Sequence, residues 1–260
     1  MTPTLSTGQL EGWIALYLWP FVRIGGCLMV APVFSASFVP VRGRLILAAA
    51  ITVLVAPLLP AQSAMAFSGE GFVILVQQLL IGIAFGFAIS LTFDAIALAG
   101  QLLANSMGLS FAFNMDPIHG ASTPVVAQFY TILVTLTFLV LNGHLTLLQV
   151  LVDSFKTLPV GTSGLGAAGL WQICLWGSQL FSGGLLVALP GVTALLVVNL
   201  AFGVVSRAAP SLNLFAIGFP VTLVCGLAIV IYGLPSVQGS FVNLLRDAFL
   251  MLGSLSTTVR

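Results

Sequence analysis

The sequence predicts an all-α membrane protein, because hydrophobic residues dominate, charges are scarce and apolar runs reach the length of a membrane span. Of 260 residues, 59% are hydrophobic and 5% are charged, whereas about a quarter of the residues in soluble proteins are charged. The formal net charge of +1 provides no field that would attract nucleic acid. We therefore expect membrane lipid and other apolar proteins, and no nucleic acid, around this chain.

Helical spans of about 20 mostly apolar residues are needed to cross ~30 Å of hydrocarbon. About six runs between ionisable side chains meet this length: 12–34, 45–66, 72–104, 125–152, 170–206 and 214–234. The fifth is longer than one span needs, and Pro190 in its middle predicts a bend, a break or a tight hairpin. Other runs are interrupted by Pro20, Pro57, Pro60 and Pro220. Such interruptions predict extensive packing against partner protein within one membrane domain over residues 1–260.

Small residues and one amphipathic stretch predict where helices meet. Gly82 and Gly86 form a GxxxG pair, and Gly183 and Gly184 are adjacent, so each pair favours close helix contact. The high background of glycine in membrane helices remains an equally good explanation for GxxxG. Residues 241–255 place apolar side chains on one helical face and polar ones opposite, which predicts an amphipathic C-terminal helix. The apolar set is Phe241, Leu244, Leu245, Ala248 and Leu252, and the polar set is Asn243, Arg246 and Asp247.

Residues 105–124 carry a different pattern from the apolar runs on either side. Large apolar side chains occupy every second position, a period of two that fits extended backbone better than helix. They are Met107, Leu109, Phe111, Phe113 and Met115, followed by the turn-forming Asp116, Pro117 and Gly120. Extended backbone cannot face lipid, so this segment should be wrapped in protein or line a cavity. The alternation alone favours an ordinary packed re-entrant loop, and an extended pore-plug loop made of deformable side chains is the alternative.

Charged residues inside the apolar surroundings should face the protein interior and have partners. These are Asp94, Arg23 and Arg207. A proton relay would need several carboxylates or histidines on successive spans, so a structural role is favoured for Asp94. We expect Arg207 to pair with Asp116 or with Asp94 and, with Asn213, to brace the break between two apolar runs.

Signatures of catalysis and of metal binding are weak in this chain. His119 and His144 are isolated, and Cys27, Cys174 and Cys225 have no CxxC spacing, so we expect neither a metal nor a cofactor. Neither a phosphate-binding GxxxxGK[ST] motif nor a zinc-binding HExxH motif occurs. The four residues Gly161 to Gly164 are similar to the GxSG of rhomboid proteases, but both histidines precede them. Rival hypotheses are an intramembrane serine protease that uses Ser163 and a small-solute transporter, which would typically show paired repeats.

Two groups of irregular motifs identify a resemblance to a known family. The first group comprises the string from Met107 to Pro117, Thr123-Pro124, Asn142-Gly-His144 and the string from Asp153 to Pro159. The second comprises Ala188-Leu-Pro190, Asn199, the string from Ser206 to Pro210, Asn213 and Gly218-Phe-Pro220. Together they resemble the FliR/SctT/SpaR family, the R subunits of type III export gates, over nearly the whole chain. The Asn142 and Asp153 strings are similar to the flagellar members, and an R subunit of a virulence injectisome is the alternative within the family.

The resemblance implies a non-enzymatic structural subunit of the flagellar export gate in the bacterial cytoplasmic membrane, at the basal body. Its partners would be several copies of the P and Q subunits in a closed helical ring, the A and B export-apparatus proteins, and unfolded flagellar substrates. It also implies that residues 107–120 plug the pore, and that an ATPase and the proton-motive force supply energy from outside the chain. Gln101 departs from the acidic residue of many relatives, so a carboxylate function at that position is not expected here.

Overall fold

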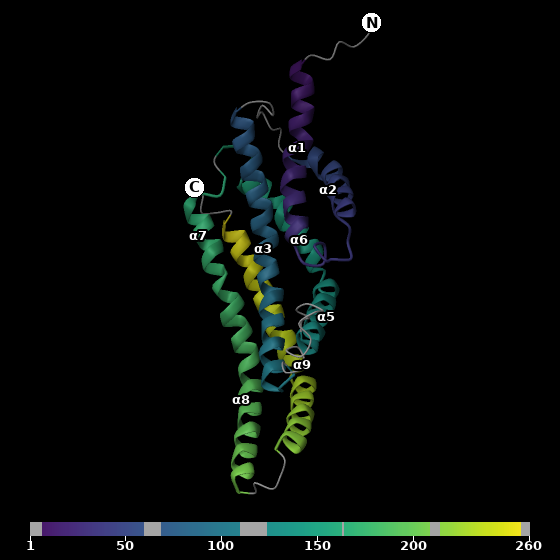
Figure 1. Cartoon of the computed structure of the whole chain (residues 1–260). Helices are drawn as coiled ribbons and strands as arrows, with labels where there is room; N and C mark the ends of the chain where they lie inside the picture. The colour runs from purple at the N-terminus through teal and green to yellow at the C-terminus, as the bar shows by residue number, and fades with distance from the viewer. Residues whose placement is uncertain (1–6, 60–68, 110–123, 163, 209–213, 256–260) are drawn as a thin grey trace. The chain divides into compact units, whose positions relative to one another are not determined.

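A computed structural model describes residues 7–59, 69–109, 124–162, 164–208 and 214–255, and every regular element in these ranges is helical (Figure 1). The elements are α1 (Thr7–Val30), α2 (Val41–Val55), the 3-10 helix η1 (Ala56–Leu58), α3 (Gly69–Ser106), α5 (Val125–Val140), α6 (Gly143–Thr157), α7 (Ala167–Trp176), α8 (Ser178–Ala208) and α9 (Leu214–Leu255). The expected all-α fold class is confirmed.

Within the described residues, four helical segments are long and apolar enough to cross a membrane. They are Val41–Leu58, Gly69–Ser106, Ala167–Ala208 and Gly218–Leu255. A fifth candidate arises if α5 and α6 together form one interrupted span. The first predicted run lies in α1, within which Ile14–Val30 is an apolar stretch. α1 ends directly before Ala31-Pro32, because the residue before a proline disfavours helix.

The helices divide between two compact units. Unit 1 contains Met1–Leu91, Leu141–Gly177 and Arg246–Arg260, and unit 2 contains Thr92–Val140 and Ser178–Leu245. The long helices α3 and α9 each contribute one part to unit 1 and the other to unit 2.

Unit 1 is built around a close contact between α1 and α3. A Cβ atom at Gly82 would collide with the carbonyl oxygen of Arg23 and lie 3.0 Å from the backbone nitrogen of Cys27. A Cβ at Gly86 would lie 2.6 Å from the Cys27 carbonyl oxygen and 2.9 Å from the Ala31 nitrogen. Only glycine lets the two backbones approach this closely, so the GxxxG pair does mark a helix contact.

Unit 2 combines small-residue contacts with an aromatic cluster. A Cβ at Gly184 of α8 would lie 2.7 Å from the carbonyl oxygen of Ala95 on α3. The ring of Phe93 packs edge-on against Phe138 of α5 and Phe241 of α9, with centroids 5.4 Å and 5.1 Å away. Three different helices therefore pack around the α3 segment of this unit.

The prolines interrupt the helices less than the sequence predicts. Pro20, Pro190 and Pro220 lie inside α1, α8 and α9, so neither a break nor a hairpin occurs at Pro190. The interruption in the fifth run falls instead at Gly177, between the last residue of α7 and the first of α8. Membrane helices tolerate proline where neighbouring groups satisfy the freed backbone, and glycine is itself a poor helix former.

Residues 241–255 form the last part of α9. Phe241, Leu245, Ala248 and Leu252 are buried, whereas Asn243, Arg246 and Asp247 are exposed. The face that carries apolar side chains is therefore the buried face of this helix.

Candidate functional site

The predicted plug segment begins at the end of α3, and the structure describes its first residues. Asn105 and Ser106 form the last turn of α3. The Leu109 amide donates to the Ala104 carbonyl at 3.0 Å, and the Gly108 amide donates to the Asn105 carbonyl at 3.1 Å. Gly108 has φ 79°, the left-handed conformation that glycine adopts without strain. This is a Schellman cap, which ends the helix and turns the chain away from its axis.

Met107, the first of the five predicted sealing side chains, lies in a slot in unit 2 rather than on an open surface. Its side chain is only 3% exposed. A Cβ at Gly226 of α9 would collide with Met107 Cγ and lie 2.7 Å from both its Sδ and its Cε. The missing side chain at position 226 therefore makes room for Met107 and fixes the end of α3 against α9.

One turn before Met107, α8 approaches the same end of α3. A Cβ at Gly191 of α8 would lie 3.0 Å from Ile229 Cγ2 of α9 and would collide with Leu103 Cδ2 of α3. The Asn199 side chain donates a long hydrogen bond of 3.4 Å to the Ser106 carbonyl, one of the carbonyls that a helix end leaves without an internal partner. The α3 terminus is thus held by α8 and α9 together.

The other predicted plug residues lie outside the described residues. These are Phe111, Phe113, Met115, Asp116, Pro117 and Gly120. Leu109 is half-buried in the turn after α3. The plug therefore remains a prediction, and its described root is the Schellman cap with Met107 seated over Gly226.

The charged residues expected to be structural are only partly described. Asp94 lies exposed on α3, and Arg207 lies exposed in the last turn of α8. Asp116 and Asn213 are outside the described residues, as are His119 and Ser163. The proposed Arg207–Asp116 pair and the bracing function of Asn213 therefore remain predictions.

Arg23 is the best-defined polar centre of the described residues, and it lies in unit 1. Its side chain is fully buried. Nε donates to Gln78 Oε1 of α3 at 2.7 Å, Nη1 donates to Ser154 Oγ of α6 at 3.0 Å, and Nη2 donates to the Leu158 carbonyl at 2.8 Å. The guanidinium carbon also lies 4.0 Å from the centre of the Phe155 ring, a cation–π contact.

Arg23 has the partners expected of a charge in apolar surroundings, but they are not acidic side chains. Each hydrogen-bond acceptor around Arg23 is neutral, and the positive charge is balanced by dipoles and an aromatic face. The planar guanidinium suits this arrangement because it offers five donors in a fixed fork and is weakly hydrated. Arg23 thereby joins α1, α3 and α6.

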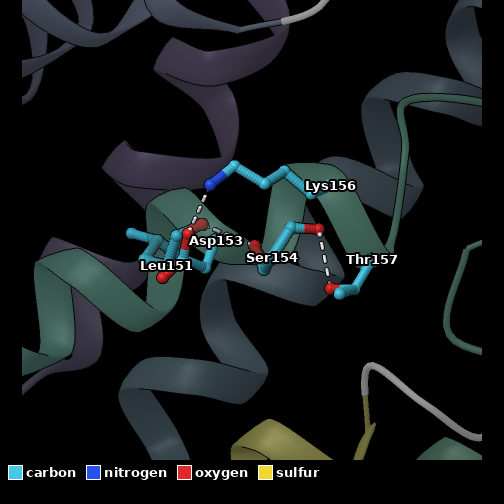
Figure 2. A network of polar contacts seen from close by, with 5 residues as sticks. All are labelled: Leu151, Asp153, Ser154, Lys156 and Thr157. Atoms are coloured by element: carbon cyan, nitrogen blue, oxygen red, sulfur yellow. Dashed lines mark hydrogen bonds and ion pairs between the residues drawn. The ribbon is translucent and has the colours of Figure 1, made fainter.

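The string from Asp153 to Pro159, recognised in the sequence only as a family resemblance, supplies most of the Arg23 site. It forms the end of α6 and the residues after it. Ser154 Oγ donates to the Leu151 carbonyl at 2.6 Å, and Lys156 Nζ lies 2.8 Å from Asp153 Oδ1. Dashed lines mark both contacts in Figure 2. Ser154 and Phe155 face Arg23, whereas Asp153 and Lys156 form an exposed pair.

Sequence reasoning missed Gln78, Gly226 and Gly191 as structural positions. Gln78 is a polar residue in the middle of an apolar run, which is a signal for a buried polar contact. The glycines gave no comparable signal, since glycine is common in membrane helices.

His144 Nδ1 is buried without a hydrogen-bond partner in the described part of the chain. No cluster of three or more metal-binding side chains occurs among those residues.

Comparison with known proteins places this architecture in a family. Residues 14–248 match the family model described as "Bacterial export proteins, family 1". The "Flagellar biosynthetic protein FliR" of Escherichia coli (strain K12) is 39% identical over 251 residues, which cover 96% of each chain. The protein of the same name from Pectobacterium carotovorum is 38% identical over 98% of this chain and 97% of its own. The Bacillus subtilis (strain 168) protein of that name is 26% identical over 83% of this chain and 84% of its own. The chain therefore belongs to the bacterial export protein family 1.

Proposed function

We propose that this chain is the R-type subunit of the flagellar type III export gate. The observation that carries the proposal is similarity over nearly the whole length to proteins named for flagellar biosynthesis, at up to 39% identity. Several helices long and apolar enough to span a membrane agree with a multi-pass protein of the cytoplasmic membrane. The relatives named above are flagellar, so the flagellar reading is favoured over an injectisome subunit and over a small-solute transporter.

The subunit would act as a structural part of the channel through which unfolded flagellar proteins cross the membrane, and not as an enzyme. Its partners would be the P and Q subunits, with the A and B export-apparatus proteins close by. The exposed large apolar side chains along α8 and α9 support burial of these helices against lipid or other apolar subunits.

Within this function, residues 107–120 would seal the resting channel. The Schellman cap at Gly108 supports this function because it directs the chain out of α3 at the start of the segment. Met107 itself is packed against α9 and would anchor the segment, so the sealing contacts would come from the residues that follow it. Large apolar side chains can close a pore to ions by excluding water.

Deletion of residues 110–119 tests the sealing function in the assembled gate. We expect the variant to raise the ion conductance of bacterial membranes that contain the gate, because water and ions can then enter the channel. The control is an equal amount of assembled gate with the full segment. Unchanged conductance at equal assembly would refute the plug.

Export itself tests the wider proposal. Cells that lack this chain should fail to secrete flagellar subunits, and a plasmid copy should restore secretion. Normal secretion without the chain would contradict membership in the gate.

A further inference from the structure

The connection between α6 and α7 lies against α1 and α3 of unit 1, and both of its ends are anchored. At the first end, the Leu158 carbonyl accepts a hydrogen bond from Arg23 Nη2 at 2.8 Å, and the Leu158 side chain is buried. At the second end, Leu165 is buried, and a Cβ at Gly169 of α7 would lie 3.0 Å from Leu165 Cδ2. The connection is therefore fixed to α1 at its start and to α7 at its end.

The residues between these ends, 160–162 and Gly164, have fewer contacts, and we call them the strap. Val160 is half-buried and packs against a buried cluster that consists of Ala15, Trp19 and Ile74. Among the described residues, no backbone hydrogen bond holds any part of the strap. Segments with few hydrogen bonds and few buried apolar contacts are those that open locally while the rest of a fold stays intact.

Gly164 lies on a side-chain amide of α3 that lacks a hydrogen-bond partner. Gly164 is buried, and a Cβ there would collide with Gln77 Oε1 and lie 2.7 Å from Gln77 Cδ. Gln77 Oε1 is itself buried and accepts no hydrogen bond from the described part of the chain. Such an acceptor is costly, because it has lost its bonds to water and has gained none in the protein. The closed position of the strap therefore carries a cost that disappears when the Gln77 amide is uncovered.

A second polar atom in the cluster beneath Val160 is also unpaired. Trp19 is fully buried, and its Nε1 donor has no partner within the described ranges. Burial of this donor and of the Gln77 acceptor opposes closure, whereas the apolar packing of Val160 favours it. Opposed contributions of this kind are expected of an element that has two alternative positions.

We propose that the strap is a conformational switch, which lifts from α1 and α3 between its two anchored ends. The unpaired amide of Gln77 shifts the equilibrium toward the lifted position. The contact between α1 and α3 at Gly82 and the hydrogen bonds of Arg23 stay in place in both positions. The switch requires only residues of unit 1 and is independent of the sealing function of residues 107–120.

The test measures how fast a thiol beneath the strap reacts with N-ethylmaleimide. Ile74→Cys places this thiol in the cluster that Val160 covers, at a position that is 4% exposed. The full chain is purified with the membrane subunits that accompany it, and mass spectrometry of its peptides follows each cysteine separately. Cys27 is the internal reference, because it is fully buried in the contact between α1 and α3. All further variants carry Ile74→Cys as well.

We expect the introduced thiol to react while Cys27 stays unmodified. Gln77→Met keeps the length of the side chain but removes the unpaired acceptor, so it should slow the reaction about tenfold. Gln149→Met is the matched control, since Gln149 is exposed on α6, and it should change the rate by less than about twofold.

A pair of glycine substitutions tests the contact from the other side. Gly164→Ala should raise the reaction rate about tenfold, because the new Cβ pushes against the Gln77 amide and favours the lifted position. Gly161→Ala is the matched control within the strap, because a Cβ there has no heavy atom within 4 Å. Equal acceleration by both substitutions would contradict the contact between Gly164 and Gln77.

Three further outcomes would overturn the proposal. Reaction of the introduced thiol only together with Cys27 would mean that unit 1 opens as a whole. No reaction of this thiol in the folded protein would mean that the strap does not lift. A rate that Gln77→Met leaves unchanged or raises would mean that the buried amide does not favour the lifted position.

Discussion

Arg23 in unit 1 and Gly226 in unit 2 hold their helices together by different physical means. Around Arg23, three directional hydrogen bonds and one aromatic face converge on a single buried cation. Around Gly226, the three atoms nearest to the position of a Cβ all belong to Met107, and the fit depends on a missing Cβ that leaves space for this side chain. The first arrangement depends on which groups donate and accept, and the second depends on volume.

Because of this difference, the two sites should tolerate different kinds of substitution. A buried acceptor that loses its donor remains unsatisfied, at a cost of about 1–3 kcal/mol. A packed apolar slot has no acceptor to leave unsatisfied, but an added methyl group must displace its neighbour. The Arg23 site should therefore respond to changes of chemistry at constant size, and the Gly226 slot should respond to changes of size at constant chemistry.

Arg23→Gln should have the largest effect on stability. It removes the fork that binds Ser154 and the Leu158 carbonyl, and leaves these two buried acceptors at the end of α6 without that donor. Relief from burying a cation offsets part of this loss, so we expect a decrease of about 2–4 kcal/mol in the free energy of unfolding. Denaturant unfolding of the purified protein in detergent measures it.

Two further variants decide whether the planar fork or the positive charge of Arg23 provides the stability that Arg23→Gln removes. Arg23→Lys keeps the charge but not the planar fork, and we expect it to recover little stability. Arg246→Gln, on an exposed side chain, should change the free energy of unfolding by less than about 0.5 kcal/mol. Recovery of wild-type stability by Arg23→Lys would contradict the role assigned to the fork.

Gly226→Ala should have a smaller effect, and one of steric origin. The added Cβ must displace Met107 at the root of the predicted sealing segment, at a cost of about 1–3 kcal/mol for overpacking. Gly233→Ala is the matched control on the same helix, because a Cβ there has no heavy atom within 4 Å. The control isolates the gain in helix propensity, about 1 kcal/mol, and the difference between the two variants measures the steric cost.

A second substitution at the contacting residue shows whether Met107 is the cause. Met107→Ala in the Gly226→Ala background should be less harmful than Met107→Ala alone, because the new methyl group occupies space that the shorter side chain has left. Strictly additive changes in the free energy of unfolding would show that the two positions do not interact. The same variants in the assembled gate show whether a displaced root raises membrane conductance.

The contrast between the two sites also explains what the sequence could and could not predict. The helical fold follows from apolar length, because a bilayer accepts few other structures. Burial of Phe241 and Leu252 followed from helical periodicity in the same way. Such patterns depend on spacing along one segment, which a single sequence displays.

Contacts between distant segments are harder to predict from the sequence. Arg23 was recognised as a charge that needs a partner, but its acceptors lie 55 to 135 residues further along the chain. Pro190 was expected to interrupt its run, yet the helix continues through it. In the sequence, nothing distinguishes Gly226 from the other glycines of the apolar runs, and the structure shows that Met107 packs against it. These features depend on which helices become neighbours, and residue spacing does not encode that directly.

The exposed pair Asp153–Lys156 should show the smallest effect, although it lies directly beside residues that bind Arg23. Its charged atoms are 2.8 Å apart, but the side chains are 51% and 68% exposed, so water and salt screen the attraction. A double-mutant cycle with Asp153→Asn and Lys156→Gln should give a coupling of about 0.3–0.5 kcal/mol that disappears at high salt. The isolated chain and the assembled gate should be compared in this cycle. A coupling well above 1 kcal/mol in the gate alone would mean that another subunit covers the pair and lowers the local dielectric constant. Equal, salt-sensitive couplings in both would mean that this face of α6 remains in water after assembly.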